Sequence, residues 1–169
     1  MEENPYVSSF NVDHTKLKCG LFVSRKDIMD TGLVITTFDL RMKRPYHEEP
    51  MSTGSVHALE HLLADYLRGD QLWGNKILYV GPMGCRTGFY VMVSGDLGPK
   101  DILPLIERAF DYISDFTGEI PGANPKQCGN CIDMDLEAAR IDATMYYNVI
   151  IDPKKENLVY PVKRERKKK

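Results

Sequence analysis

The sequence has no run of about 18 consecutive apolar residues, the length that a membrane-spanning helix requires. Its N-terminus, Met1-Glu2-Glu3-Asn4-Pro5, is acidic and lacks the basic and then apolar segments of a secretory signal. These two absences argue against a membrane protein and against a secreted one. We therefore expect a cytoplasmic protein.

Cysteine is scarce, with four residues at positions 19, 85, 128 and 131. In a reducing cytoplasm such cysteines are free thiols, metal ligands or nucleophiles rather than disulfide partners. Cys128 and Cys131 form a CxxC pair, which alone is compatible with a redox site or with half of a zinc site. The sequence has no second CxxC pair and no thioredoxin-like βαβ pattern. We therefore favour Cys128 as a single metal ligand and assign no role to Cys131.

Basic residues are in excess only at the C-terminal end. Residues 163–169 hold six basic and one acidic residue, a net +5, so the total of −2 leaves −7 for residues 1–162. An acidic body is a poor candidate for sequence-independent nucleic-acid binding, which needs a basic surface. With 169 residues and 43% apolar content the chain is typical of one domain, which we assign to residues 1–152. Residues 153–169 are predicted to be a basic, solvated tail, with docking to an acidic partner as the alternative.

The residue pattern predicts both strands and helices. Residues 8–14 alternate polar and apolar side chains, which favours a short extended segment. Strands are predicted over 18–29, 33–42, 77–80 and 88–94. Helices are predicted over 55–69, with Ser55 as N-cap and Gly69 as C-terminal stop, over 102–113 after an Asp101 cap, and over 135–150.

The most informative stretch is residues 55–64, inside the first predicted helix. At about 100° per residue, His57, Glu60 and His61 lie on one face of this helix, and apolar side chains cover the rest. Histidines four residues apart can bind one metal ion, and a glutamate between them lies beside that ion without ligating it. Two histidines alone could equally be core or surface residues, but the order His-x-x-Glu-His is that of inverted zinc hydrolases. We predict a metal site that takes its third ligand, preferably Cys128, from elsewhere in the chain and leaves a fourth position open.

The pattern leaves the roles of two further residues open. Cys85 lies beside Arg86 in a turn with glycines at positions 81, 84 and 88. A neighbouring cation can lower a thiol pKa and produce a reactive thiolate, but a small buried thiol fits the same position. Arg41 ends the strand predicted over 33–42 and projects, with Asp39, from the face opposite its apolar residues. There it is either a surface residue or an anion clamp.

Six motifs occur in the order and spacing of one family, the S-ribosylhomocysteine lyases or LuxS proteins, which the chain resembles over about residues 8–145. Several motifs in register are far more specific than His-x-x-Glu-His alone. The motifs are Ser9-Phe10 with Asp13-His14-Thr15, Phe38-Asp39-Leu40-Arg41, His57-Ala58-Leu59-Glu60-His61-Leu62, Pro82-Met83-Gly84-Cys85-x-Thr87-Gly88, Ser94-Gly95-Asp96, and Gln127-Cys128-Gly129.

The resemblance implies an enzyme of the activated methyl cycle. Its reaction would split S-ribosylhomocysteine into homocysteine and 4,5-dihydroxy-2,3-pentanedione, from which autoinducer-2 forms. We accordingly predict a single α+β domain, with an antiparallel sheet packed against helices. The resemblance also implies a homodimer with two active sites at the subunit interface, and no nucleic-acid or membrane partner is expected.

The same resemblance implies roles for individual residues. One divalent metal ion per subunit is implied, Fe²⁺ natively with Zn²⁺ or Co²⁺ as possible substitutes. Its implied ligands are His57, His61 and Cys128. The implied acid/base pair is Cys85 and Glu60, and the positions that match substrate-lining residues are Ser9, His14 and Arg41.

Some positions depart from the family pattern. The family usually has Asp-Ile-Ser where this chain has Tyr79-Val80-Gly81, so an acidic side chain near the site is missing. Met134 replaces a common histidine, Lys43-Arg44-Pro45-Tyr46 replaces a polar stretch, and the segment from about residue 152 is longer and basic. One alternative is a metallopeptidase with an inverted zinc motif, although it gives Cys85 no role. The other is a non-catalytic metal or redox module that uses Cys128 and Cys131.

Overall fold

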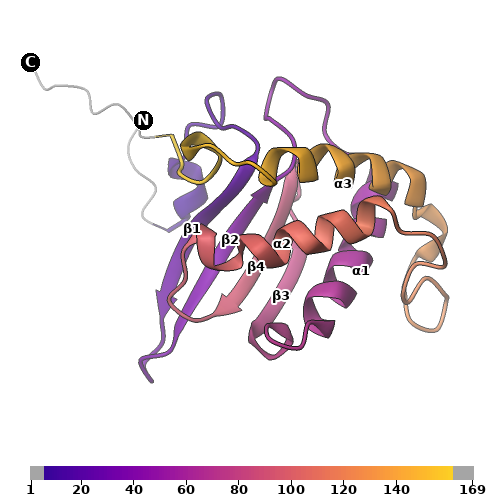
Figure 1. Cartoon of the computed structure of the whole chain (residues 1–169), viewed down its shortest axis with the longest axis horizontal. Coiled ribbons are helices and arrows are strands. Elements are labelled where there is room, and N and C mark those ends of the chain that lie inside the picture. Colours follow the sequence, from indigo (N-terminus) through magenta and orange to yellow (C-terminus); the bar gives the residue numbers. More distant parts are fainter. Residues whose placement is uncertain (1–5, 162–169) are drawn as a thin grey trace, which may run out of the picture.

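The four predicted strands pair into one antiparallel sheet in a computed structural model that describes residues 6–161 (Figure 1). The sheet order is β1-β2-β4-β3. The strands are β1 (Gly20–Ile28), β2 (Val34–Arg41), β3 (Ile77–Pro82) and β4 (Gly88–Ser94). Residues 1–5 and 162–169, with the acidic N-terminus and the basic run, lie outside the described residues.

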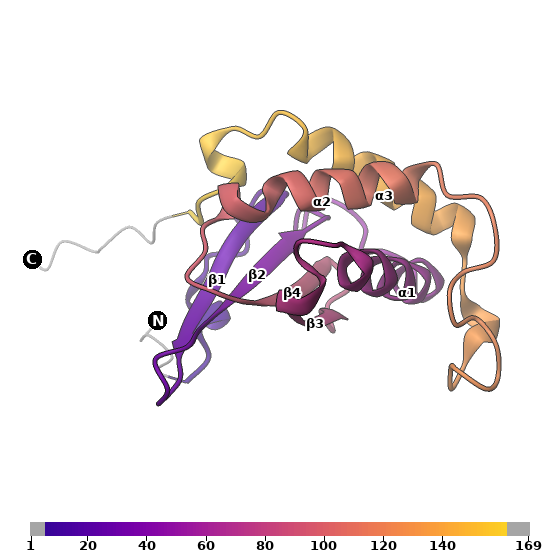
Figure 2. The same cartoon turned by 60° about the horizontal axis from the view of Figure 1, so that its bottom comes forward.

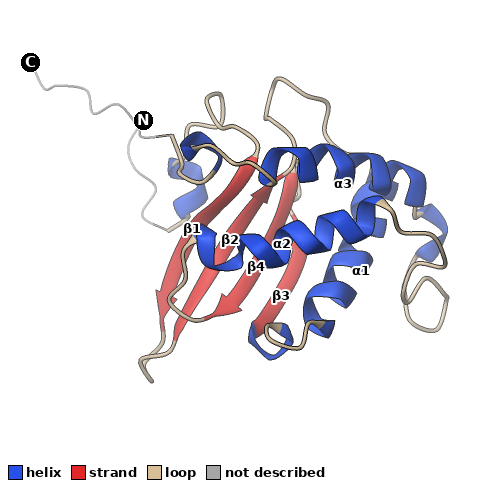
Figure 3. Cartoon of the chain, in the orientation of Figure 1, coloured by secondary structure: helices blue, strands red, loops and turns tan. Residues whose placement is uncertain are grey.

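Three α-helices pack on one face of this sheet, as Figure 2 shows. They are α1 (Thr53–Gly69), α2 (Pro99–Ser114) and α3 (Leu136–Ile150). Figure 3 shows the helices and strands as separate layers, and all three strand pairings are antiparallel, so the predicted α+β class with an antiparallel sheet is confirmed. No α-helix among residues 6–161 is long and apolar enough to cross a membrane.

The alternation of side chains along β2 separates the two faces of the sheet. Phe38 and Leu40 are fully buried and belong to the core that the helices cover. Asp39 and Arg41 project from the opposite face because successive side chains of a strand point to opposite sides. Arg41 lies opposite Gly88 in the β2–β4 register. The predicted orientation of Asp39 and Arg41 is therefore correct, although both side chains are buried rather than exposed.

Some predicted boundaries are wrong. The N-cap of α1 is Ser52, whose hydroxyl accepts from the Ser55 backbone N–H at 3.1 Å, so Ser55 lies inside the helix. The N-cap of α2 is Gly98, and Asp101 instead accepts from the Gly98 backbone N–H at 2.6 Å. The predicted end of α1 at Gly69 is confirmed.

The segment predicted to be extended over 8–14 contains a 3₁₀ helix, Ser8–Asn11. An extended segment needs a neighbouring strand to satisfy its backbone, whereas here the backbone bonds to itself. The Phe10 N–H donates to the Val7 carbonyl at 3.1 Å, and the Val12 N–H donates to the Ser9 carbonyl at 3.3 Å. Local hydrogen bonds therefore replace the expected strand pairing.

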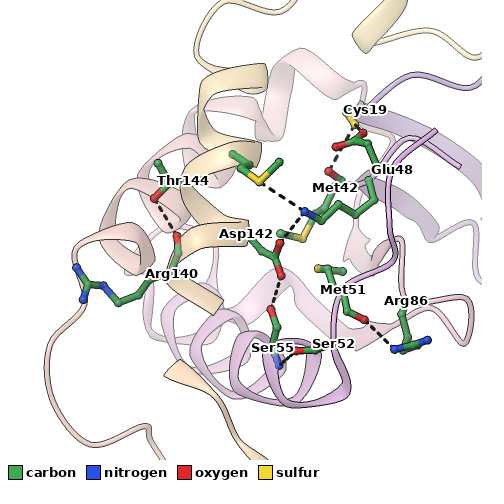
Figure 4. A network of polar contacts seen from close by, with 12 residues as sticks. Cys19, Met42, Glu48, Met51, Ser52, Ser55, Arg86, Arg140, Asp142 and Thr144 are labelled. Carbon is green, nitrogen blue, oxygen red and sulfur yellow. Dashed lines mark hydrogen bonds and ion pairs between the residues drawn. The ribbon is translucent and has the colours of Figure 1, made fainter. Parts of the chain in front are cut away.

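A buried polar network ties the start of α1 to α3 and to the segment after β2 (Figure 4). The Ser55 hydroxyl donates to Asp142 Oδ2 at 2.5 Å, and Lys43 Nζ lies 2.7 Å from Asp142 Oδ1. Ser55, Lys43 and Asp142 are 0%, 6% and 9% exposed, so water contributes little to the solvation of the two charges. The network holds the helix that carries His57 and His61 against α3.

Asp142→Ala should lower the free energy of unfolding by about 3–5 kcal/mol, because it leaves the Lys43 ammonium buried without its counter-charge. Urea unfolding followed by circular dichroism measures this loss. Replacing both charges at once, Lys43→Met with Asp142→Leu, should restore much of it. Glu137→Ala, which removes an exposed ion pair with Arg140, is the matched control and should change stability by less than about 1 kcal/mol. A similar loss of stability in Asp142→Ala and Glu137→Ala would contradict the role of the buried pair.

Candidate metal and thiolate site

Three predicted metal ligands meet beside α1. His57 and His61 come from successive turns of that helix, and Cys128 comes from the loop between α2 and α3. One donor atom from each lies within 4.8 Å of the other two, and Cys128 Sγ is 3.3 Å from His57 Nε2. All three residues are half-buried. Two imidazole nitrogens and one thiolate are a donor set that tetrahedral zinc and related divalent ions accept.

Each histidine has a partner that orients its ring. His57 Nδ1 lies 2.7 Å from Asp133 Oδ1, and His61 Nδ1 lies 2.7 Å from the Pro121 carbonyl oxygen. A carbonyl can only accept, so Nδ1 of His61 carries a hydrogen, and Nε2 is the nitrogen that can bind a metal ion. Metal-binding histidines typically use such partners to set their tautomer and orientation. The residues present therefore fit a metal ion at this place.

Two glycines allow the loops to approach the helix. A Cβ at Gly54 would lie 2.4 Å from the Asp133 carbonyl oxygen, a distance that real contacts do not reach. Gly122 has a φ of +72°, which favours glycine, and a Cβ there would lie 3.2 Å from His61 Nδ1. The Asp135 N–H donates to the Gly54 carbonyl at 3.1 Å and fastens the Asp133 segment to α1.

Glu60 lies on the same face of α1 and is half-buried. It lines a hollow with His61, Ala64 and Arg68, and another with His57 and Arg86. Its carboxylate is therefore close to both histidines yet outside the group of three donors. A carboxylate in this place can accept or donate a proton next to a molecule held by the metal.

Cys85 belongs to a second cluster, formed at the polar end of β2. Arg41 Nη1 lies 4.0 Å from Cys85 Sγ and donates to Thr87 Oγ1 at 2.6 Å. Thr87 Oγ1 is 3.1 Å from Cys85 Sγ, and because it accepts from Arg41 its own hydrogen is available to the sulfur. Although partial burial favours the neutral thiol, the Thr87 hydrogen bonds and the Arg41 guanidinium lower the pKa of Cys85 from its ordinary value. Cys85 is exposed, so a reactive thiolate can reach a substrate.

The cation beside Cys85 is Arg41 and not the sequence neighbour Arg86. Arg86 has a φ of +57° and is turned away, with Nη1 donating to the Met51 carbonyl at 3.0 Å. The Met51 N–H donates back to the Arg86 carbonyl at 3.0 Å, which holds the turn in this conformation. Gly88 completes the arrangement, because a Cβ there would lie 2.1 Å from the Leu40 carbonyl oxygen. Close approach of β2 and β4 thus places Arg41 beside the Cys85 turn.

The remaining predicted residues are divided between two hollows. His14 lines a hollow of about 520 Å³ with Cys85 and Thr87. Ser9 lines a different hollow, with Tyr79, Tyr90 and other residues of the open sheet face. Cys85 and Glu60 also line different hollows. Gly84 and Arg86, on either side of Cys85, line the hollow that His57 and Glu60 share, so the turn lies between the donor group and the hollow that the thiol lines.

Sequence reasoning missed two residues that support the donor group and the thiol. Thr87 bridges Arg41 and Cys85; the Cys85-x-Thr87-Gly88 motif contains this residue, but no role was predicted for it. Asp133 orients His57 from 76 positions away, and no local pattern indicates such a contact.

Comparisons with known proteins agree with the motifs. Residues 7–157 match the family model described as S-ribosylhomocysteinase (LuxS). The S-ribosylhomocysteine lyase of Finegoldia magna is 49% identical over 155 residues, which cover 92% of this chain and 97% of the relative. The protein of the same name from Phocaeicola vulgatus is 45% identical over 158 residues, covering 93% and 98%. That from Porphyromonas gingivalis strain W83 is 46% identical over 156 residues, covering 92% and 98%.

Asp133→Ala should weaken Zn²⁺ binding about 10- to 100-fold, because His57 loses the partner that sets its tautomer and orientation. Competition with a chromophoric chelator measures the dissociation constant. Asp133→Asn keeps an acceptor oxygen and should lose less affinity than Asp133→Ala. Unchanged affinity in Asp133→Ala would show that the contact does not support metal binding.

Proposed function

The chain belongs to the LuxS family of S-ribosylhomocysteine lyases, and we propose that it cleaves the thioether of S-ribosylhomocysteine to give homocysteine and 4,5-dihydroxy-2,3-pentanedione, the precursor of autoinducer-2. It is thus a carbon–sulfur lyase that acts on a small molecule. One observation supports this assignment for the residues of this chain. The chain has both a possible metal-binding group, His57, His61 and Cys128, and a Cys85 thiol whose pKa is lowered.

The chemistry explains why both parts are needed. An unactivated thioether breaks only when a carbonyl is moved along the sugar until the sulfur lies β to it. Each shift removes a proton from carbon and places one on oxygen. A divalent ion held by His57, His61 and Cys128 would act as a Lewis acid toward the sugar oxygens when bound. We propose Fe²⁺ as the native ion, with Zn²⁺ or Co²⁺ able to replace it.

The acid/base work is assigned to Cys85 and Glu60. The Cys85 thiolate, stabilised by Arg41 and Thr87, abstracts a proton from carbon and returns it at the neighbouring carbon. Glu60, beside the donor group, exchanges protons on the other side of the sugar and protonates the departing thiolate. Arg41, His14 and Ser9 are proposed to bind substrate.

We further propose that two copies of the chain complete each site. Support comes from the separation of Cys85 and Glu60 into different hollows of one chain. The sheet face that no α-helix of residues 6–161 covers also carries exposed apolar surface, including Tyr79 at 49% exposure. Such a face is suited to pack against a second copy, which would bring complementary parts together. The four free thiols suit a reducing cytoplasm.

The peptidase alternative is not favoured. The reaction of an inverted zinc peptidase would use the metal-binding residues and would give Cys85 no role. In this chain, however, Arg41 and Thr87 contact Cys85 and lower the pKa of its thiol. A purely structural metal or redox module likewise leaves this cluster unexplained.

Cys85→Ala and Glu60→Ala should each lower homocysteine release by about 100- to 10,000-fold, because each removes one proton-transfer group. Anaerobically purified holoenzyme is given S-ribosylhomocysteine, and released thiol is detected with DTNB. Metal content should stay at the wild-type level in both variants. Cys19→Ser and Glu137→Ala, which alter the same residue types outside the site, should keep full activity. Full activity in Cys85→Ala or Glu60→Ala would overturn the assigned roles.

The acid limb of kcat/KM should follow the Cys85 thiolate. Since the pKa of Cys85 is lowered in the folded chain, activity is retained at pH values where an ordinary thiol is protonated, and it falls as the pH drops through that lowered pKa. Thr87→Val removes a hydrogen bond to the thiolate and should move the acid limb to higher pH. Thr87→Ser keeps the hydroxyl and should leave the limb in place. An identical limb in Thr87→Val would remove Thr87 from the mechanism.

A further inference from the structure

The segment after α3 returns to the first strand of the sheet (Figure 1). Asn157 Nδ2 donates to the Cys19 carbonyl at 2.8 Å, and a Cβ at Gly20 would lie 2.1 Å from the Asn157 carbonyl oxygen. Tyr160 then stacks on Phe22 of β1, with ring centroids 4.7 Å apart and planes at 11°. Tyr160 is thereby held on the sheet face that carries Asp39 and Arg41.

The Tyr160 hydroxyl completes a buried ion pair. It donates to Asp39 Oδ2 at 2.7 Å, the same oxygen that lies 2.6 Å from Arg41 Nη2. Asp39 and Arg41 are 1% and 2% exposed. Asp39 Oδ1 and Arg41 Nε have no hydrogen-bond partner among the described residues. Tyr160 therefore supplies a large share of the hydrogen bonding available to a carboxylate that water does not reach.

The contacts continue without a gap to the reactive thiol. Tyr160 bonds to Asp39, Asp39 pairs with Arg41, and Arg41 reaches both Thr87 and Cys85. We propose that Tyr160 is a positioning residue, which sets how the Arg41 guanidinium is shared between Asp39 and the Cys85 thiolate. This inference rests on the proposed roles of Arg41 and Cys85. Tyr160 lies beyond residue 157, where the match to the family model ends.

The direction of the effect follows from electrostatics. Burial and the neighbouring Asp39 carboxylate raise the pKa of Tyr160 far above its usual range, so the hydroxyl stays protonated and remains a donor. Without that donor, Asp39 depends more heavily on Arg41 for its stabilisation. The guanidinium is then less available to the thiolate, and the thiol pKa of Cys85 rises.

The test is Tyr160→Phe, which removes only the hydroxyl and keeps the stacking on Phe22. The holoenzyme is alkylated with iodoacetamide across a pH series, and the label on Cys85 is quantified by peptide mass spectrometry. The midpoint should move to higher pH by about half a unit or more. The kcat for homocysteine release, measured at a pH below the wild-type midpoint, should fall by about 3-fold or more, with KM nearly unchanged. Tyr112→Phe, which removes a hydroxyl from α2, is the matched control and should follow the wild type.

A double-mutant cycle tests whether Tyr160 acts through Asp39. If it does, adding Tyr160→Phe to an Asp39→Asn chain should produce no further shift of the Cys85 midpoint. Other titratable groups near Cys85 are His14, His47, Glu48 and Glu49, which line the same hollow and are unchanged in every variant.

The outcomes separate this inference from the proposed function. Suppose that the wild type releases homocysteine and that Cys85 in Tyr160→Phe has the wild-type alkylation midpoint. Tyr160 is then not a positioning residue, and a lower melting temperature of the variant would not change this conclusion. An equal shift in the Asp39→Asn background also overturns the proposal. Absence of homocysteine release from the metal-loaded wild type contradicts the proposed function instead, and the alkylation midpoints still decide whether Tyr160 influences Cys85.

Discussion

The period of a single helix constrains the whole arrangement. Along α1, Leu59 and Leu63 are fully buried in the core, so His57 and His61 must point along a different face. Rotation of the helix would expose the leucines and move both histidines together. The bond from Ser55 to Asp142 fixes that rotation at the N-terminal turn, two positions before the first histidine. The packing of the core therefore also fixes the positions of His57 and His61.

The sheet separates two kinds of chemistry. Its helix-covered side supports α1 and the donor group, and its other side carries a buried ion pair of Asp39 and Arg41. Burying such a pair is costly unless both charges are well bonded. Contacts from the turn before β4, through Thr87, and from the C-terminal segment, through Tyr160, offset this cost. The same contacts leave Arg41 beside Cys85, where its charge favours a thiolate.

Much of the fold could be predicted because the relevant signals are local. The four strands, the body of α1 and the last helix were found within a few residues, since β-branched content and helical spacing are properties of short windows. The helix starts were less predictable. By residue type, either Ser52 or Ser55 could be the N-cap of α1. Ser52 is the N-cap, and the Ser55 hydroxyl instead donates a hydrogen bond to Asp142. The 3₁₀ helix Ser8–Asn11 was not predicted, because alternating polar and apolar residues form a strand only if a partner strand lies beside them.

The α+β class, the common face of His57, Glu60 and His61, and the family can all be predicted from the chain alone, because each depends on the spacing of residues along it. Tertiary structure decided which distant residues support them. Asp133 reaches His57, and Tyr160 reaches Asp39, only because loops and the C-terminal segment fold back onto the domain. Such contacts join residues far apart in the chain, and their energies depend on burial and distance, which no local pattern contains.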